Sequence, residues 1–268
     1  MATAPAKRLK FPLRLLFPHD KPFSGLLIGL LLATDDVRHL RKLLITKPDY
    51  GSEASESERA IVNGELGHVF RLMCSHLYEA MDAFTRFDDR YRSLLDEAAI
   101  DDRARDALAK VRQARSTIWP GQGRRSFIDI VRNLVGFHYI EQKLRKTLDE
   151  HEGRLDQQGR PHLEGTLVLS PFQGFGRYTV ADRLVTLLIS DEIGVNLDDF
   201  PQRYMHEIGE AINLVGALAD VVDYLIGYLL AKRLDQIEQH EEEIPIDPDI
   251  ERAREEVERA RRGDVGQR

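Results

Sequence analysis

Apolar residues recur at intervals of three and four along most of this chain, a spacing typical of amphipathic α-helices. The longest such pattern, within residues 51–87, has apolar side chains at Ile61, Leu66, Val69, Leu72, Met73, Leu77, Ala80 and Phe84. Similar patterns predict long helices over 24–45, 125–152 and 200–239, a short helix over 184–193, and one or two helices within 88–117. We therefore predict an all-α fold, built as an antiparallel helical bundle.

Glycine and proline mark where the helical pattern stops. The glycine-rich segment 153–180 contains an alternating stretch, TLVLS, and then RYTV, which together predict a small β-hairpin inserted near 163–180. Ser24 is the expected N-cap of the first helix. We assign residues 1–240 to one helical domain and 241–268 to a charged, solvated tail. Neither a βαβ rhythm nor a glycine-rich phosphate motif is present, which excludes a dinucleotide fold and a P-loop.

Composition restricts the function classes. The net charge of -7 over 268 residues argues against a general nucleic-acid coat, although it leaves room for a local basic site. The single cysteine, Cys74, can form neither an internal disulfide nor a thiolate metal cage, and we expect a cytoplasmic protein. The longest apolar run, Gly25 to Ala33, is about half of what a bilayer requires, so no membrane span is expected.

A metal site is a weak alternative. Glu65 and His68 have the Glu-x-x-His spacing used by carboxylate-bridged metals in bundles, and His76, Glu79 and Asp82 lie further along the same predicted helix. A di-metal bundle needs a second Glu-x-x-His pair, and the sequence contains none suited to that role. We expect neither a bound metal nor a cofactor.

The most informative motif is RNLVGFHY, at residues 132–139. An arginine followed by a histidine at similar spacing also occurs at Arg14–His19, Arg71–His76, Arg145–His151 and Arg233–His240, so spacing alone carries no information. Only Arg132 is followed by a polar amide, Asn133, and only His138 is followed by a tyrosine, Tyr139. On an ideal helix Arg132 and His138 lie about 120° and about 9 Å apart.

The motif resembles the Arg-x(4–6)-His signature of the HEPN superfamily, helical-bundle proteins often found in toxin–antitoxin and antiphage systems. The resemblance covers this segment and the general picture of long antiparallel helices around it. It implies a metal-independent endoribonuclease that acts as a homodimer, with two copies of the motif facing each other. Carried onto this chain, it makes Arg132, Asn133 and His138 the catalytic residues. Tyr139 is then a supporting residue in substrate binding.

The residue types suit this chemistry. A histidine that titrates near neutrality can take the proton of the attacking 2′-hydroxyl. An arginine can neutralise the charge that develops on the phosphorus. Pairing two copies in a symmetric dimer supplies both an acid and a base. The Arg124–Arg125 pair just before the motif helix could steer a phosphate backbone, so Arg125 joins the substrate-binding residues. A solvated helix start is the simpler explanation of the pair, and cations there oppose the helix dipole.

Two other readings remain open. In the first, Arg132 pairs with Asp129 or with a carboxylate on a neighbouring helix, and His138 is a satisfied interior residue. The protein is then a non-catalytic dimerisation or protein-binding module, acting as a regulator or antitoxin-like partner. In the second, it is a structural bundle without a ligand. The catalytic reading requires a partly exposed Arg132 in a cleft shared with a second chain, whereas the binding reading requires a motif that is covered or paired with local carboxylates.

Overall fold

The structure is a computed structural model. It describes residues 3–18, 20–46, 56–119, 126–133, 141–155, 159, 161–163, 167–168, 177–196 and 199–245.

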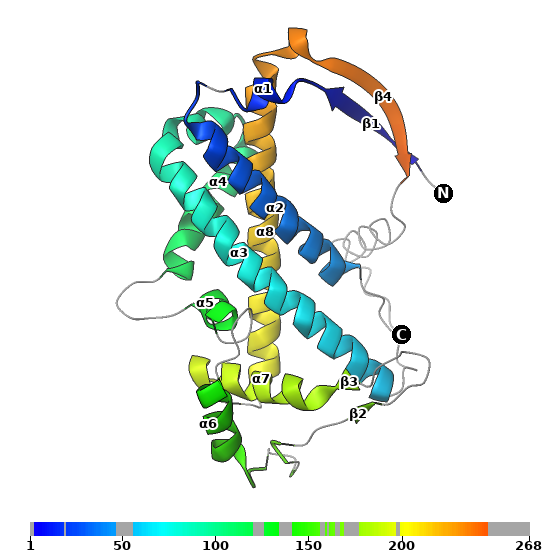
Figure 1. The fold of residues 1–268 in the computed structure, drawn as a ribbon, viewed down its shortest axis with the longest axis vertical. Coiled ribbons are helices and arrows are strands. Elements are labelled where there is room, and N and C mark those ends of the chain that lie inside the picture. Colours follow the sequence, from blue (N-terminus) through cyan, green and yellow to red (C-terminus); the bar gives the residue numbers. More distant parts are fainter. Residues whose placement is uncertain are drawn as a thin grey trace.

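Three long helices form the body of the molecule, α2 (Phe23–Ile45), α3 (Glu56–Ala98) and α8 (Phe200–Ala231). Helix α2 lies along α3, and α8 packs against both of them (Figure 1). A fourth helix, α4 (Asp102–Ile118), packs against α8, and the short α1 (Leu13–Leu16) lies at one end of α8. The predicted all-α character is therefore confirmed.

The core is continuous along α3. Its fully buried side chains follow the helical spacing that the sequence predicts, and they are Phe70, Met73, Cys74, Leu77, Ala80, Met81, Phe84 and Phe87. Helix α8 contributes a matching stripe that includes Val215, Leu218, Val222 and Leu225. Because each helix turns an apolar stripe inward, burial of these stripes against one another is the main stabilisation of the bundle.

Local sequence signals explain several helix boundaries. Helix α4 begins after Asp101, whose side chain accepts a hydrogen bond from the Ala104 backbone N–H at 2.8 Å. It ends at Ile118, and the sequence Trp119-Pro120-Gly121 follows, in which proline and glycine disfavour continuation of a helix. Helix α3 is bent at Tyr91, where the backbone leaves helical geometry (φ -133°, ψ 37°). The expectation that Ser24 caps α2 is wrong, because α2 begins one residue earlier and the Ser24 hydroxyl donates to the Pro18 carbonyl.

The lower end of the molecule in Figure 1 is built from three shorter helices, α5 (Phe127–Val131), α6 (Glu141–His151) and α7 (Thr179–Ile193). Helix α5 packs against α3 and α7, and α6 packs against α7. Within 125–152, where the sequence predicts a single helix, the structure describes two helical stretches, α5 and α6. Residues 134–140, between them, lie outside the described residues.

Two small antiparallel ladders complete the fold. Strands β2 (Leu167–Val168) and β3 (Arg177–Tyr178) pair as the predicted hairpin. The second ladder was not predicted: β1 (Thr3–Lys10) pairs with β4 (Glu238–Pro245) over eight residues, from Thr3 opposite Pro245 to Lys10 opposite Glu238. This ribbon curves away from the helices in Figure 1. Part of the segment that we assigned to a solvated tail is thus a strand, and residues 246–268 lie outside the described residues.

Helix α8 is also relevant to the membrane question. Among the described residues it alone has the length and apolar composition of a membrane-spanning helix, with a mean hydropathy of 1.7 over its most apolar window. Core helices of water-soluble proteins pass the same test, and α8 packs against α2, α3 and α4. This finding is weak evidence for a membrane span.

Candidate functional site

The structure describes the first two residues of the motif, Arg132 and Asn133. The other three predicted site residues, Arg125, His138 and Tyr139, lie outside the described residues. Arg132 follows directly after α5, and with Asn133 it forms a π-helical turn. Such wide turns are often found at functional positions. The ideal α-helical placement used to relate Arg132 to His138 therefore does not hold at the start of the motif.

Arg132 reaches from α5 to α3 and pairs there with Glu79. Its Nη2 and Nε donate to Glu79 Oε1 at 2.6 and 3.2 Å. The guanidinium also lies over the ring of Tyr78, with Cζ 4.4 Å from the ring centroid, in cation–π contact. The arginine side chain is 30% exposed and that of Glu79 is 50% exposed. Arg132 is thus fixed in position while its guanidinium stays accessible to solvent.

Asn133 holds Arg132 from the other side. Its Oδ1 accepts a hydrogen bond from Arg132 Nη1 at 3.2 Å. Its Nδ2 donates to the carboxylate and to the backbone carbonyl of Asp129, one turn earlier in α5. Both polar groups of the amide are therefore engaged, and Asn133 links Asp129 to Arg132.

Tyr78 connects the site to the end of α4. Its hydroxyl accepts a hydrogen bond from the Trp119 indole N–H at 2.8 Å, and the two rings meet edge to face at 5.3 Å. Trp119 comes directly after α4, so one aromatic pair ties α3 and α4 together while its tyrosine face supports Arg132. Sequence reasoning missed this platform because no local pattern relates positions 78, 119 and 132.

The charges around Arg132 are mixed. Two carboxylates, of Glu79 and Asp129, lie in the network with the guanidinium of Arg132. A phosphodiester that binds here therefore needs further cations, supplied by other residues of the motif segment or by a second protomer.

Cys74 lies on α3, five positions before Glu79, and is fully buried. Burial, and to a smaller extent the negative charge of Glu207, raises the pKa of this thiol far above its usual value. Because only a thiolate is a good nucleophile, the buried thiol is unsuited to catalysis.

Three of the residues considered for a metal site, Glu79, Asp82 and His76, lie next to charged side chains. Glu79 pairs with Arg132, Asp82 pairs with Arg86 at 2.8 Å, and His76 Nδ1 lies 3.5 Å from a carboxylate oxygen of Asp36. No group of three or more His, Cys, Asp or Glu side chains suited to a metal ion occurs in the part of the chain that the structure describes.

Two histidines, His151 and His162, lie close together near the contact between α6 and α7. His151 is buried, and its Nε2 lies 3.1 Å from both carboxylate oxygens of Asp191. Its Nδ1 lies 2.9 Å from Nδ1 of His162. Because a carboxylate accepts, the Nε2–H tautomer of neutral His151 fits this geometry, and its Nδ1 then accepts from His162. His151, which follows Arg145 at the same spacing as the motif, is thus a satisfied interior histidine.

Comparisons with protein-family models, with curated proteins and with solved structures find no significant match to this chain. Function is therefore argued from the site alone. Its geometry meets one requirement of each main reading: Arg132 is partly exposed, as the catalytic reading requires, and it is paired with a local carboxylate, as the binding reading requires.

Proposed function

We propose that this chain is a HEPN-like, metal-independent endoribonuclease that acts as a homodimer, as an effector of toxin or phage-defence type. The observation that carries the proposal is the state of Arg132. The hydrogen bonds from Nε, Nη1 and Nη2 use three of the five N–H donors of a guanidinium. Within the described residues the others remain for a phosphate oxygen. A fixed, partly exposed arginine with spare donors is suited to bind a phosphate.

In this mechanism Arg132 binds a non-bridging oxygen of the scissile phosphate and stabilises the charge that grows there as the 2′-hydroxyl attacks. His138 accepts the proton of that hydroxyl. The second copy of the motif supplies the acid that protonates the departing 5′-oxygen. Arg125 and Tyr139 bind the RNA substrate.

The surrounding residues have positioning roles. Glu79 and Asn133 orient the guanidinium from two sides, and the Tyr78 ring restricts its motion. A preorganised cation does not have to be ordered during the reaction, which lowers the barrier. Asn133, assigned above to the catalytic residues, acts through Arg132 because both of its polar groups are already engaged.

The test measures cleavage of end-labelled RNA in EDTA by the wild type, by Arg132→Ala and by His138→Ala. Arg115→Ala is the matched control, because Arg115 also reaches α3, where it pairs with Asp89 at 2.7 Å and is 42% exposed. We expect wild-type and Arg115→Ala cleavage to be equal, and each motif variant to be slower by about 100-fold or more. Absence of cleavage by the wild type, or equal cleavage by all four proteins, contradicts the proposal.

The homodimer is tested separately by sedimentation equilibrium. A monomer at the concentrations where RNA is cleaved would remove the shared site from the mechanism. In that case the acid has to come from the same protomer.

A second candidate function is a non-catalytic module that binds a protein partner, as a regulator or antitoxin-like protein. The ion pair between Arg132 and Glu79 favours it, because the positive charge is already compensated within the chain. The variant Glu79→Gln distinguishes the two. If Glu79 orients a catalytic arginine, this variant lowers kcat for RNA more than it changes KM. If the pair is only structural, Glu79→Gln and Arg132→Ala leave any RNA turnover unchanged.

A further inference from the structure

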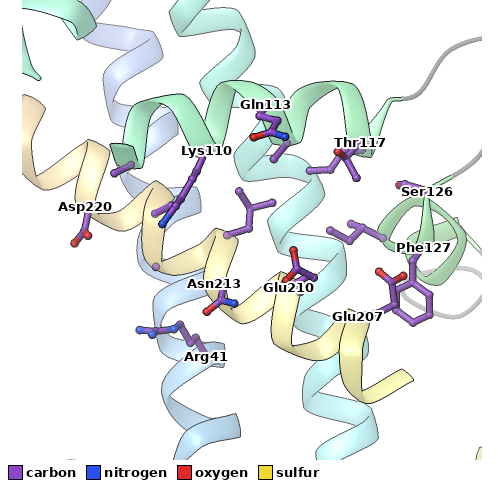
Figure 2. A pocket seen from close by; sticks show the side chains of 18 of the residues that line it. Arg41, Lys110, Gln113, Thr117, Ser126, Phe127, Glu207, Glu210, Asn213 and Asp220 are labelled. Carbon is purple, nitrogen blue, oxygen red and sulfur yellow. The ribbon is translucent and has the colours of Figure 1, made fainter. Parts of the chain in front are cut away.

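One face of helix α2 is turned away from the rest of the bundle. The opposite face supplies core residues, which are Leu27, Leu30, Thr34 and Val37. Toward α8, Arg38 pairs with Asp223. Figure 2 shows Arg41 beside α8, where its Nη2 lies 3.7 Å from the position of an added Cβ on Gly216. The sides of α2 that meet the bundle are thus occupied, and the remaining face is exposed to solvent.

This exposed face is apolar at two levels and charged between them. Leu32 is 63% exposed, and Leu43, eleven positions later, is 38% exposed. Between them lie three exposed ionisable residues, Asp35, Asp36 and His39. At 100° per residue, Leu32, His39 and Leu43 fall within about 20° of one line along the helix. The two leucines and the charges between them therefore form a single surface.

The surface is complementary to itself when two copies run antiparallel. A register that places Leu32 of one chain opposite Leu43 of the second copy also places Asp36 opposite His39. Each contact then occurs twice, because an antiparallel pair of identical helices has twofold symmetry. The imidazole of His39, neutral or protonated, can donate a hydrogen bond to the carboxylate of Asp36.

The charges favour this orientation over a parallel one. Asp35 and the exposed Lys42 lie on the same side of the face, so in the antiparallel register each carboxylate of Asp35 lies near Lys42 of the second copy. A parallel pair in register would instead place like charges against one another. From α3, His76 Nδ1 lies 3.5 Å from Asp36. A carboxylate accepts several hydrogen bonds, so this contact leaves Asp36 able to bind His39.

We propose that this face of α2 binds the same face of a second copy of the chain, antiparallel, with Leu32 of each copy packed against Leu43 of the other. The helices overlap over residues 28–46, about 27 Å of helix. Association removes the exposed leucines from water while the charges between them are paired. The proposal goes beyond the homodimer of the nuclease proposal, which names no surface, and it holds whether or not RNA is cleaved.

Disulfide cross-linking of the full chain tests the register. Leu32→Cys and Leu43→Cys are made in separate chains, one of which carries a tag that changes its size, and the mixture is oxidised. The native Cys74 is buried and does not compete. We expect the mixed dimer to form in large excess over either self-linked dimer, because like positions lie about 16 Å apart in this register. A disulfide requires Cα atoms within about 7 Å. Self-linked dimers in equal or greater amount overturn the proposal.

Sedimentation equilibrium tests the surface itself. Leu32→Gln should raise the Kd of the dimer by about 100-fold, since each dimer loses two buried leucines. Ile100→Gln is the matched control, because Ile100 is 67% exposed and lies outside α2, and it should leave the Kd unchanged. Circular dichroism confirms that each variant retains its helices.

Two results overturn the proposal. In the first, the wild type stays monomeric up to millimolar concentration, which means that something other than a second copy covers α2, such as another protein or a lipid surface. In the second, Leu32→Gln and Ile100→Gln weaken the dimer equally, which places the contact elsewhere. Neither measurement uses RNA, so failure of the nuclease proposal is recognised separately from failure of this one.

Discussion

Two arginines reach helix α3 from neighbouring helices and bind carboxylates there, yet they do so in different surroundings. Arg112 of α4 donates from Nε and Nη2 to Asp88 and from Nη1 to Asp96. Its side chain is 23% exposed and that of Asp88 is 7% exposed. Arg132 binds Glu79 nine positions earlier on α3, where the two side chains are 30% and 50% exposed.

The difference shows what each pair does. Burial opposes the charge of Arg112, but its hydrogen bonds with Asp88 and Asp96 outweigh this effect and raise the pKa of the guanidinium. Two carboxylates thus enclose Arg112, which is a structural link between α3 and α4. Arg132 has one carboxylate, an amide and an aromatic face, and it keeps donors toward solvent. The same chemistry therefore forms a closed link in one region and an accessible cation in the other.

The largest effect is expected for Asp88→Ala. Removing this buried carboxylate leaves Arg112 partly buried with Asp96 as its remaining partner, and should lower the free energy of unfolding by about 3 kcal/mol. Urea denaturation followed by circular dichroism measures it. Asp89→Ala is the control one residue away, where the ion pair with Arg115 is exposed, and it should cost less than about 1 kcal/mol. Equal losses in the two variants would contradict a structural role for Arg112.

The rate at which the Cys74 thiol is labelled gives a second measure of how strongly each ion pair stabilises the fold. Because burial raises its pKa, the native thiol stays protonated and should react with Ellman's reagent only after the helix opens. In Asp88→Ala, a loss of about 3 kcal/mol raises the labelling rate by about 100-fold, whereas Glu79→Gln changes it little. Labelling should accelerate with pH as an unfolded thiol ionises near pH 8.5.

The raised pKa of Cys74 also determines whether the free energy of unfolding rises or falls with pH. The folded thiol holds its proton more tightly than the unfolded one, so this group stabilises the fold below the unfolded pKa and loses that contribution as pH rises above it. The measurement is urea denaturation at pH 7.5 and at a pH above about 9, where the unfolded thiol is ionised. A stability of the wild type, relative to Cys74→Ala, that increases over this interval would contradict the shift.

A smaller effect is expected for Trp119→Phe. This change keeps most of the edge-to-face contact but removes the donor to the Tyr78 hydroxyl, and should cost about 1 kcal/mol of unfolding free energy. If the platform positions Arg132, the same variant also lowers the rate of RNA cleavage without a matching change in KM. If the variant loses stability but retains the full rate of RNA cleavage, the Tyr78–Trp119 pair does not position Arg132 for catalysis.

The smallest effect is expected for the exposed pair itself. A double-mutant cycle with Glu79→Gln and Arg132→Gln should give a coupling free energy of at most about 1 kcal/mol. This coupling should decrease at 1 M NaCl, because salt screens exposed charges. A coupling above about 3 kcal/mol would place this pair in the same class as Arg112 and Asp88.

Helical periodicity predicted most of the bundle because the apolar stripe that each helix buries is visible in the sequence of that helix alone. The buried stripe from Met73 to Phe84 and the end of α4 at Ile118 are examples of such local information. The motif drew attention to Arg132 and Asn133, but Glu79 and Tyr78, which contact Arg132, lie more than fifty positions away and follow no local rule. Glu79 was instead considered as a metal ligand, since spacing along one helix does not reveal what a neighbouring helix brings against it.

The sequence patterns did not predict the β1–β4 ribbon, for a related reason. Its two strands are 228 residues apart at their nearest paired positions, Lys10 and Glu238, and β4 lies in a segment dominated by charge. Pairing over such a separation depends on where the helices leave the two ends of the chain, which no window of sequence contains.

This ladder also sets an order of events during synthesis. The strand β1 precedes every described helix in the chain, and its partner β4 is translated only after all of them. Throughout that interval the segment that forms β1 lacks the partner strand with which it pairs in the structure. The full ladder can therefore close only once the residues up to Pro245 have been translated, after every described helix has been made.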